Sequence, residues 1–386
     1  MFRFVCFLVL ALNFSLGISS SITDDLLSVE DYKNKAKEFL NVYKQNNYYH
    51  GAFEDITLGL NTKAFAEIRI KPKYLIDVSH INMSTTVLGT PADWPVGVAP
   101  MARHRDAHPD GEIATARGAG KSGSIFILSS LAQTLLEDVA QGAPDTEKWF
   151  QMYLNKNQTI NSMFIDRAER AGYKAIVLTL DDPTDSVVRN LNYQKFRKLY
   201  STDFPNYSSM GLSLNQHTFG PSTNVEDLRQ FVQNTKLPVI VKGVLTGSGA
   251  ALAKTAGVKG VIVSNHGGRN LDSAPASIEA LPEVVDAVGG QMTVMLDSGI
   301  RGGPEVFKAL ALGAKQVFVG SPVIWGLAID GEDGVHSLLE MIKNEFEVVM
   351  TLAGSSNLTE IKRGQVVHES YYDFLLMHHN HSKKKN

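Results

Sequence analysis

The chain has 386 residues, of which 44% are hydrophobic and 20% are charged, as is ordinary for a globular protein that buries a large core. Its formal net charge of −3 and its pI of about 6.4 imply no broad basic face, which argues against nucleic acid as a partner. The length allows two or three domains or a single α/β barrel with insertions, and no Pro/Gly/Ser-rich linker divides the chain.

The first residues form a segment of their own. The stretch MFRFVCFLVLALNFSLGISS places Arg3 ahead of an apolar run and then small residues, which is typical of a secretory signal peptide, so we expect residues 1–19 to be removed. An uncleaved membrane anchor is the alternative, although the apolar run is short for a full span. Cys6, the only cysteine, lies in this segment, so the mature chain would carry no disulfide. We therefore expect a secreted or lumenal protein.

The rest of the chain begins with helical periodicity and continues as a repeating α/β pattern. VEDYKNKAKEFLNVYKQ predicts an N-terminal helical segment over residues 29–45. Apolar runs then alternate with amphipathic ones such as DGEIATARGAGKSG and NSMFIDRAERAGYKA. The apolar runs are WPVGVAP, GSIFILSS, KWFQMYL, YKAIVLTLD, LPVIVKGV, VKGVIVSN, MTVMLDSG and KQVFVGSP.

Strands that are apolar throughout, each followed by a helix, predict a parallel sheet that is buried on both faces. Eight such units predict a closed (β/α)8 TIM barrel over residues 22–375, with an open doubly wound sheet as the alternative. The longest irregular stretch, residues 185–223 after the fourth strand, predicts a lid loop over the strand ends. Residues 376–386 predict a disordered, solvated tail rather than a metal site, and the final HSKKKN is not a peroxisomal signal.

The ends of the predicted strands carry the chemistry of such a barrel. Residues that could bind a ligand follow nearly every strand, which suits one large polar ligand lying across the barrel mouth. In chain order they are Pro100, Met101, Ala102, Ser129, Ser130, Gln151, Tyr153, Thr179, Asp181, Lys242, Ser264, Asn265, His266, Arg269, Asp297, Ser298, Gly299, Arg301, Gly320 and Ser321.

The last two strand ends indicate a phosphate site. DSGIRGGPEVFKAL places Arg301 and glycines ahead of a helix start, and VFVGSPVIWG places Gly320 and Ser321 in the same position. Backbone N–H groups at helix N-termini bind phosphate, and barrels often use the loops after strands seven and eight for it. The glycines alone would also suit tight turns, but that alternative leaves Arg301 unexplained.

Lys242, at the end of the predicted fifth strand, is expected to point into the barrel mouth. Buried lysines are rarely unpaired. Three interpretations remain open: an ion pair with an acid such as Asp297, a fixed cation beside an electron-rich cofactor, or a Schiff-base lysine.

SNHGGRNLD places His266 and Arg269 together directly after a buried strand. Arginine offers a two-pronged donor for a carboxylate, and histidine takes up a proton near neutral pH. The pair suits a substrate with a carboxylate beside a hydroxyl: Arg269 would hold the acid, His266 would take the hydroxyl proton, and Asp181 would orient the imidazole. A turn histidine that caps a backbone group is the alternative.

SNHGGRNLD closely resembles the active-site signature of the FMN-dependent α-hydroxy-acid oxidases and dehydrogenases. The resemblance runs from about Asp31 to Ile361 through the ordered motifs AHPDGEIATARGAG, RAERAGYKAIVLTLD, LPVIVKG, DSGIRGGPEVFKALALGA and IKNEFEVVM. It implies a TIM barrel that binds FMN at the carboxyl ends of its strands. The residues it places around the flavin are Pro100, Met101, Ala102, Ser129, Gln151, Thr179, Lys242, Ser264, Asp297, Ser298, Gly299, Ile300, Arg301, Gly320 and Ser321.

The same resemblance implies roles at the substrate. His266 would be the base, Arg269 the carboxylate clamp, Asp181 the orienting group and Tyr153 a hydroxyl partner. The implied reaction is oxidation of (S)-2-hydroxy acids to 2-oxo acids by FMN, after which O2 reoxidises the flavin and gives hydrogen peroxide. The resemblance implies no metal, and it implies a homo-oligomer such as a tetramer. It also implies a peroxisomal location as an alternative. The alternative function, of a different class, is that of a binding protein: a catalytically impaired secreted homologue that binds flavin or another ligand.

Two departures concern the substrate carboxylate. A tyrosine that the family has in the N-terminal segment falls on Asn47, and a shift of one residue would supply Tyr48 instead. A second arginine after strand four falls on Val188, with Arg189 next to it. Tyr48 and Arg189 are therefore our candidates for these substrate contacts.

Two further departures concern the pocket wall and the phosphate. Leu131 stands where the glycolate-type enzymes have a tryptophan, which leaves room for a longer substrate side chain. Ser321 stands where the family usually has an arginine beside the phosphate loop. Loss of that contact costs about 1.5–3 kcal/mol if nothing compensates.

Overall fold

The computed structural model describes residues 22–23, 25–183, 204–212 and 223–374. The expected signal peptide, the tail, Val188 and Arg189 lie outside these residues. Of the expected lid at residues 185–223, residues 204–212 and Thr223 are described.

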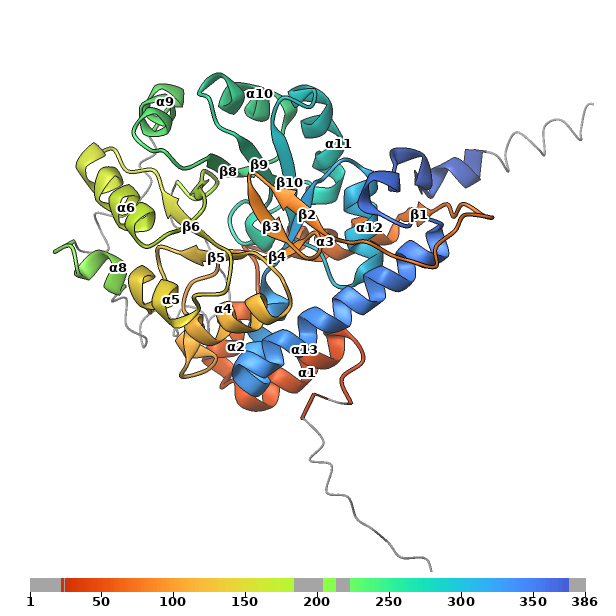
Figure 1. Cartoon of the computed structure of the whole chain (residues 1–386), viewed down its shortest axis with the longest axis horizontal. Coiled ribbons are helices and arrows are strands. Elements are labelled where there is room, and N and C mark those ends of the chain that lie inside the picture. The colour runs from red at the N-terminus through yellow and green to blue at the C-terminus, as the bar shows by residue number, and fades with distance from the viewer. Residues whose placement is uncertain (1–21, 24, 184–203, 213–222, 375–386) are drawn as a thin grey trace, which may run out of the picture.

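Eight parallel strands close into a barrel, which confirms the predicted (β/α)8 architecture and excludes the open sheet (Figure 1). The spatial order is β10-β11-β4-β5-β6-β7-β8-β9. Each apolar run of the sequence supplies one strand: β4 (Val96–Val98), β5 (Phe126–Ser129), β6 (Lys148–Tyr153), β7 (Ile176–Thr179), β8 (Val239–Val244), β9 (Gly260–Val263), β10 (Thr293–Asp297) and β11 (Gln316–Val319).

Helices surround the barrel, so both faces of each strand are buried (Figure 1). They are α4 (Gly111–Lys121), α5 (Leu136–Gly142), α6 (Gln158–Arg170), α9 (Val225–Gln233), α10 (Gly247–Thr255), α11 (Ser277–Val288), α12 (Gly303–Ala311) and α13 (Ser321–Ala353), with the short α8 (Pro205–Ser208) between β7 and α9. Within the described part of the chain, no helix is long and apolar enough to cross a membrane.

The N-terminal segment is helical as expected, but it contains a break. The periodic stretch forms α1 (Val29–Phe39) and α2 (Val42–Tyr49), followed by α3 (Ile56–Ala66). Leu40 is extended, and the side chain of Asn41 accepts hydrogen bonds from the backbone N–H groups of Tyr43 and Lys44 at 3.1 and 3.0 Å. A single capping asparagine therefore starts a new helix, which apolar spacing alone does not reveal.

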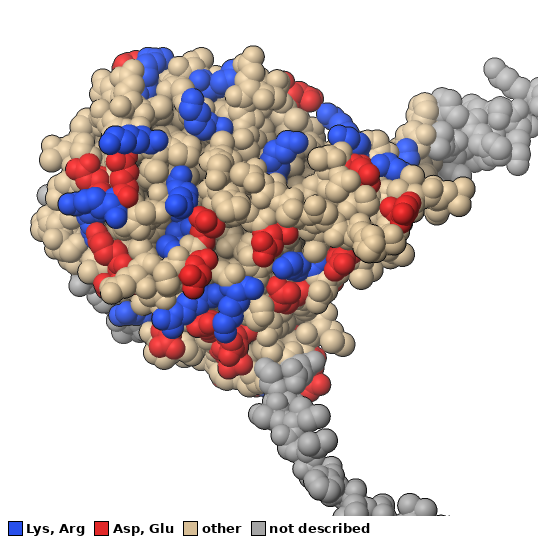
Figure 2. Space-filling model, viewed as in Figure 1, with Lys and Arg blue, Asp and Glu red and all other residues tan. Residues whose placement is uncertain are grey.

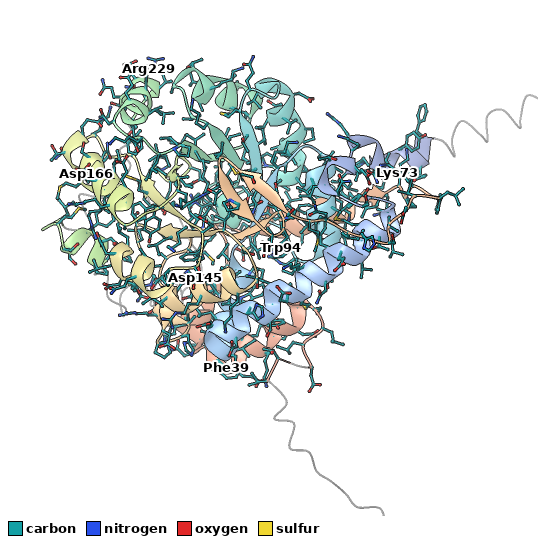
Figure 3. The ribbon with its side chains drawn as sticks, in the orientation of Figure 1. Phe39, Lys73, Trp94, Asp145, Asp166 and Arg229 are labelled. Atoms are coloured by element: carbon teal, nitrogen blue, oxygen red, sulfur yellow. The ribbon has the colours of Figure 1, made fainter. Side chains whose placement is uncertain are left out.

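A β-hairpin covers the N-terminal end of the barrel. Its strands β2 (Thr85–Val87) and β3 (Thr90–Ala92) lie in front of the barrel in Figure 1. Trp149, fully buried inside the barrel, donates from Nε1 to Thr90 Oγ1 at 2.9 Å. Trp94, near the centre of Figure 3, donates in the same way to Ser124 at 2.8 Å. A ligand must therefore enter at the opposite end.

Smaller elements complete the fold. β1 (Ile68–Ile70) pairs antiparallel with β12 (Val366–His368), and short 3-10 turns lie at His104–Asp106, His266–Gly268, Leu358–Glu360 and Arg363–Gln365. On the face shown in Figure 2, basic and acidic side chains are interspersed.

Candidate active site

The inward-facing side chains change from apolar to polar along the barrel strands. Inside the barrel lie Ile127, Trp149, Val177, Ile240, Ile262, Met295 and Phe318. Two residues further along the same strands are Ser129, Gln151, Thr179, Lys242, Ser264, Asp297 and Gly320. Because side chains alternate with a period of two, both sets face the barrel axis. The structure thus gathers the predicted strand-end residues at one end, above an apolar plug.

His266 directly follows β9 at this end of the barrel. Its Nδ1 is 2.9 Å from Asp181 Oδ1, as expected for an orienting carboxylate. The backbone of His266 has φ +59°, a left-handed conformation that is uncommon for a residue other than glycine. Its N–H donates to Ser264 Oγ at 3.0 Å. The turn after β9 is therefore held in an unusual conformation that directs the imidazole toward Asp181.

The Asp181 carboxylate favours one tautomer of His266, because a carboxylate oxygen can only accept a hydrogen bond from Nδ1. Asn270, which lies beside both residues, donates from its side-chain amide to the Asp181 carbonyl at 2.9 Å. With the proton on Nδ1, the ring donates to the Asp181 carboxylate, and Nε2 keeps a lone pair that can accept a proton. Asn270 was overlooked in the sequence reasoning, although it lies in the same motif as His266.

Asp181 remains ionised at neutral pH. Its burial alone would raise the pKa of the carboxyl, but the charges of His266 and Lys242 and the hydrogen bond from His266 hold that pKa below its ordinary value. Asp181 packs directly on Gly243 of β8, where φ is +96° and a Cβ would clash with the carboxylate. Only glycine allows Asp181 to approach Lys242 and His266 this closely.

Lys242 is a buried cation with a specific partner. Its side chain is 4% exposed, and Nζ lies 3.3 Å from Asp297 Oδ2 and donates to Ser264 Oγ at 2.8 Å. Burial alone would lower the pKa of Lys242, but the charges of Asp297 and Asp181 raise it above its ordinary value. The ion pair with Asp297 is therefore present. A Schiff base needs a neutral amine, so the raised pKa argues against that interpretation.

Tyr153 is the last residue of β6 and pairs with Thr179 of β7. The side-chain amide of Gln151 donates to the Thr179 hydroxyl at 2.9 Å. Burial raises the pKa of Tyr153 well above its ordinary value, and the charges of Asp182 and Asp181 raise it further, whereas Arg269 lowers it. The phenol therefore stays protonated and can donate a hydrogen bond. The same interactions place its hydroxyl within electrostatic reach of Arg269.

Of the two residues predicted to contact the substrate carboxylate, Tyr48 and Arg189, the structure describes only Tyr48. Tyr48 is buried, and its hydroxyl donates to the Arg103 carbonyl at 2.8 Å, in the loop after β4. Arg103 in turn pairs with Asp106 at 2.7 Å. The substrate contact assigned to Tyr48 stays a prediction, and so does that of Arg189, which lies outside the described residues.

Helix α3 supports the His266 turn from behind. Asp272 accepts hydrogen bonds from the backbone N–H groups of Glu54 and Thr57 at 3.0 and 2.9 Å, just before and within the first turn of α3. Asn61 and Asn265 exchange two side-chain hydrogen bonds at 3.0 and 2.6 Å. These contacts join residues more than 200 positions apart, and no local pattern in the sequence indicates them.

The loop after β10 and the start of α13 form a basic site that fits a phosphate. Arg301 stacks over Trp325 at 5.6 Å and donates to its neighbour's carbonyl, that of Ile300, at 2.8 Å. Burial lowers the pKa of Arg301 from its ordinary value, and the charges of Glu305 and Glu30 offset this only in part. Gly320 is the N-cap residue of α13, the helix that carries Trp325. A bound phosphate would add a further counter-charge to this buried guanidinium.

Across residues 22–374, apart from the undescribed gaps, no cluster of three or more His, Cys, Asp or Glu could hold a metal ion. The polar strand ends and the basic loop instead match the needs of FMN: hydrogen-bonding groups and a cation for the ring, and a cationic site for the phosphate.

Comparison with known proteins gives the same result. Residues 36–368 match the FMN-dependent dehydrogenase family. A peroxisomal (S)-2-hydroxyacid oxidase of Arabidopsis thaliana, GLO4, is 41% identical over 352 residues, covering 89% of this chain and 97% of its own. 2-Hydroxyacid oxidase 2 of Bos taurus is 42% identical over 343 residues, covering 88% and 97%.

Solved structures are similar over the same region. A lactate oxidase of Pediococcus acidilactici has a TM-score of 0.85 at 34% identity, covering 89% of this chain and 95% of its own. A mandelate oxidase with (S)-2-phenylpropionate has a TM-score of 0.80 at 34% identity, covering 87% and 97%. With its barrel, its partly buried His266–Asp181 pair, its buried Lys242–Asp297 pair and this similarity, the chain belongs to the FMN-dependent dehydrogenase family.

Proposed function

We propose that this protein oxidises (S)-2-hydroxy acids to 2-oxo acids with FMN as cofactor, and that molecular oxygen takes up the electrons and leaves as hydrogen peroxide. The observation that carries the proposal is the His266–Asp181 pair, which lies beside the buried Lys242 cation at the open end of the barrel. Relatives named as hydroxy-acid, lactate and mandelate oxidases support the same reaction class.

Different residues accept the proton, bind the substrate and stabilise the charge that develops. FMN, when bound, accepts the two electrons that leave the substrate with its α-hydrogen. His266 takes the hydroxyl proton at Nε2, and Asp181 stabilises the imidazolium that results. Arg269 holds the substrate carboxylate through charge-assisted hydrogen bonds. Lys242 stays protonated and stabilises negative charge that develops near it.

Tyr153 and the phosphate site complete the arrangement. The protonated phenol of Tyr153 donates a hydrogen bond to the substrate and thereby fixes the orientation of its hydroxyl group. Arg301 and the start of α13 hold the phosphate, so that the cofactor is bound by contacts far from the reacting atoms.

An anaerobic spectral titration tests the proposal. The purified mature protein should be yellow, and (S)-lactate, glycolate or a longer (S)-2-hydroxy acid should bleach its flavin absorbance without oxygen, whereas (R)-lactate should not. Admission of air should restore the colour and produce hydrogen peroxide. A colourless protein, or a yellow one that no hydroxy acid bleaches, would contradict the oxidase and favour the catalytically impaired binding protein.

We infer that the substrate carries a longer side chain than glycolate does, because Leu131 replaces a bulky ring on the pocket wall. Leu131→Trp should lower kcat/KM for a six-carbon 2-hydroxy acid while that for glycolate is kept or raised. Leu131→Met, which has nearly the same volume, serves as the control. Equal effects of both variants on both substrates would contradict the inference.

We also propose that the protein is secreted or lumenal after removal of residues 1–19, with the peroxisome as the alternative suggested by relatives of that name. N-terminal sequencing of the protein from its native cells distinguishes the two. A homo-oligomer, such as a tetramer, is proposed from the resemblance to the family, and the exposed apolar side chains of Tyr74, Leu75 and Leu352 offer surface for a contact between copies. Light scattering of the purified protein at micromolar concentration tests the assembly.

A further inference from the structure

A short segment beside the active site, residues 204–212, is fixed to the barrel by Asn206. This side chain is fully buried; its oxygen accepts from the Leu136 N–H at 2.8 Å, and its amide donates to the Thr134 carbonyl at 3.1 Å. Arg167, which forms an ion pair with Glu137, donates to the Asn206 carbonyl at 2.7 Å. The backbone of α8 is thus held against the loop after β5.

The next residue, Tyr207, reaches from this anchor to the site. It is 2% exposed, and its ring contacts Phe164 edge-on with centroids 4.8 Å apart. Its hydroxyl lies 3.4 Å from Ser130 Oγ. Ser130 is the middle residue of a turn between Ser129, expected at the flavin, and Leu131, expected at the substrate side chain. Tyr207 is therefore the large side chain packed behind this turn.

Tyr207 also lies near Tyr153. Its proximity contributes to the raised pKa of Tyr153, and burial raises the pKa of Tyr207 itself to about 12. Both phenols are therefore protonated at neutral pH, and each can act as a hydrogen-bond donor. The turn 129–131 and Tyr153 come from neighbouring strands, since Ser129 of β5 pairs with Gln151 of β6.

We propose that Tyr207 is a positioning residue of the active site. It acts through Ser130 and Tyr153 on the part of the wall that contacts the substrate, and Asn206 fixes it in place. The proposal deepens the proposed function and rests on it, because the wall matters only if a hydroxy acid binds there.

Tyr207→Phe, with Tyr173→Phe as the matched control, tests the proposal. Tyr173 is equally buried and packs in the same aromatic cluster, on Phe150, but its hydroxyl donates to the Leu136 carbonyl at 2.9 Å. Each variant removes one buried hydroxyl and keeps the ring, so both should lower the melting temperature. Only Tyr207→Phe should also lower kcat/KM, by roughly five-fold, as expected for the loss of one hydrogen bond.

A binding measurement without turnover provides the second readout. The holoprotein is titrated with pyruvate while the visible absorbance and circular dichroism of its flavin are recorded. Tyr207→Phe should weaken pyruvate binding by roughly the same factor and change the circular dichroism of the bound flavin, whereas Tyr173→Phe should match the wild type. Asn206→Asp, which loses the donation to Thr134, should shift both signals in the same direction.

The outcomes separate this inference from the proposed function. If none of the hydroxy acids bleaches the wild-type flavin, the proposed oxidase function is wrong. The circular dichroism of the flavin still reports in that case whether Tyr207 shapes the site. If Tyr207→Phe matches Tyr173→Phe in kinetics, pyruvate binding and flavin circular dichroism, then Tyr207 contributes only to stability and the inference is overturned.

Discussion

The two ends of the barrel differ although the same strands build both. On β8, Ile240 lies in the apolar interior and Lys242 lies at the mouth; on β10, Met295 and Asp297 are placed in the same way. A step of two residues along a strand, about 7 Å, separates a side chain that contributes only packing from one that carries charge. Stability and chemistry are therefore divided along the strand axis, and a substitution at one end should leave the other function nearly intact.

His266→Ala should give the largest effect and test the division from the open end. Loss of a general base lowers kcat/KM by roughly 10²–10⁴-fold. The flavin content should stay close to that of the wild type, and the melting temperature should fall less than in a variant of the apolar interior, because the side chain lies outside that interior although it pairs with Asp181. Stopped-flow reduction by (S)-lactate measures the rate, and a variant that is reduced at the wild-type rate would refute the role given to His266.

Trp149→Ala tests the division from the closed end. The side chain is fully buried, and its loss should lower the free energy of unfolding by about 3–5 kcal/mol through lost contacts and a cavity. Urea titration of the variant measures this change. In the fraction of molecules that remains folded at low temperature, (S)-lactate should still reduce the flavin at a rate close to that of the wild type. A rate as low as that of His266→Ala would mean that the two ends are not independent.

Arg301→Met should weaken the cofactor rather than the fold. A charge-assisted contact contributes about 1.5–3 kcal/mol, so the Kd for FMN should rise by about 10–100-fold. Quenching of flavin fluorescence on titration into apoprotein measures it, with Arg301→Lys as the control that keeps the charge. Unchanged affinity in the methionine variant would place the phosphate elsewhere.

Asp181→Asn should change how stability depends on pH. Since the folded-state pKa of Asp181 lies below its ordinary value of 3.8, its ionised form stabilises the fold above that value, and this stabilisation is lost as the pH falls through the lower, folded-state pKa. Urea titrations from pH 6 down to pH 3 should therefore show a steeper loss for the wild type than for the variant. Parallel curves would show that the carboxylate is not stabilised by His266 and Lys242.

Thr90→Val should give the smallest effect. It removes the acceptor of the Trp149 indole N–H while keeping the shape of the side chain, and it should cost about 1 kcal/mol of stability. Activity should be unchanged. The urea midpoint should fall with no change in the slope of the transition, and a loss of activity would indicate that the hairpin influences the open end.

Much of this arrangement could be predicted because it repeats along the chain. Lys242, Ser264 and Asp297 each end an apolar run, and parallel strands bring such ends together whatever else the chain does. The ion pair between Lys242 and Asp297 was one of three predicted alternatives, and only the geometry and the raised pKa of Lys242 favoured it. The break at Leu40 was missed, because one capping asparagine interrupts an otherwise continuous apolar pattern.

The sequence by itself determined the barrel, the position of the site at the carboxyl ends of its strands and the His266–Arg269 motif, because each depends on residues close together in the chain. Only the tertiary structure decided that α3 holds the His266 turn through Asp272 and Asn61, that Asn270 bridges to Asp181, and that Tyr207 packs behind Ser130. These contacts join segments far apart in the sequence, and their formation depends on the packing of the whole barrel rather than on any local preference.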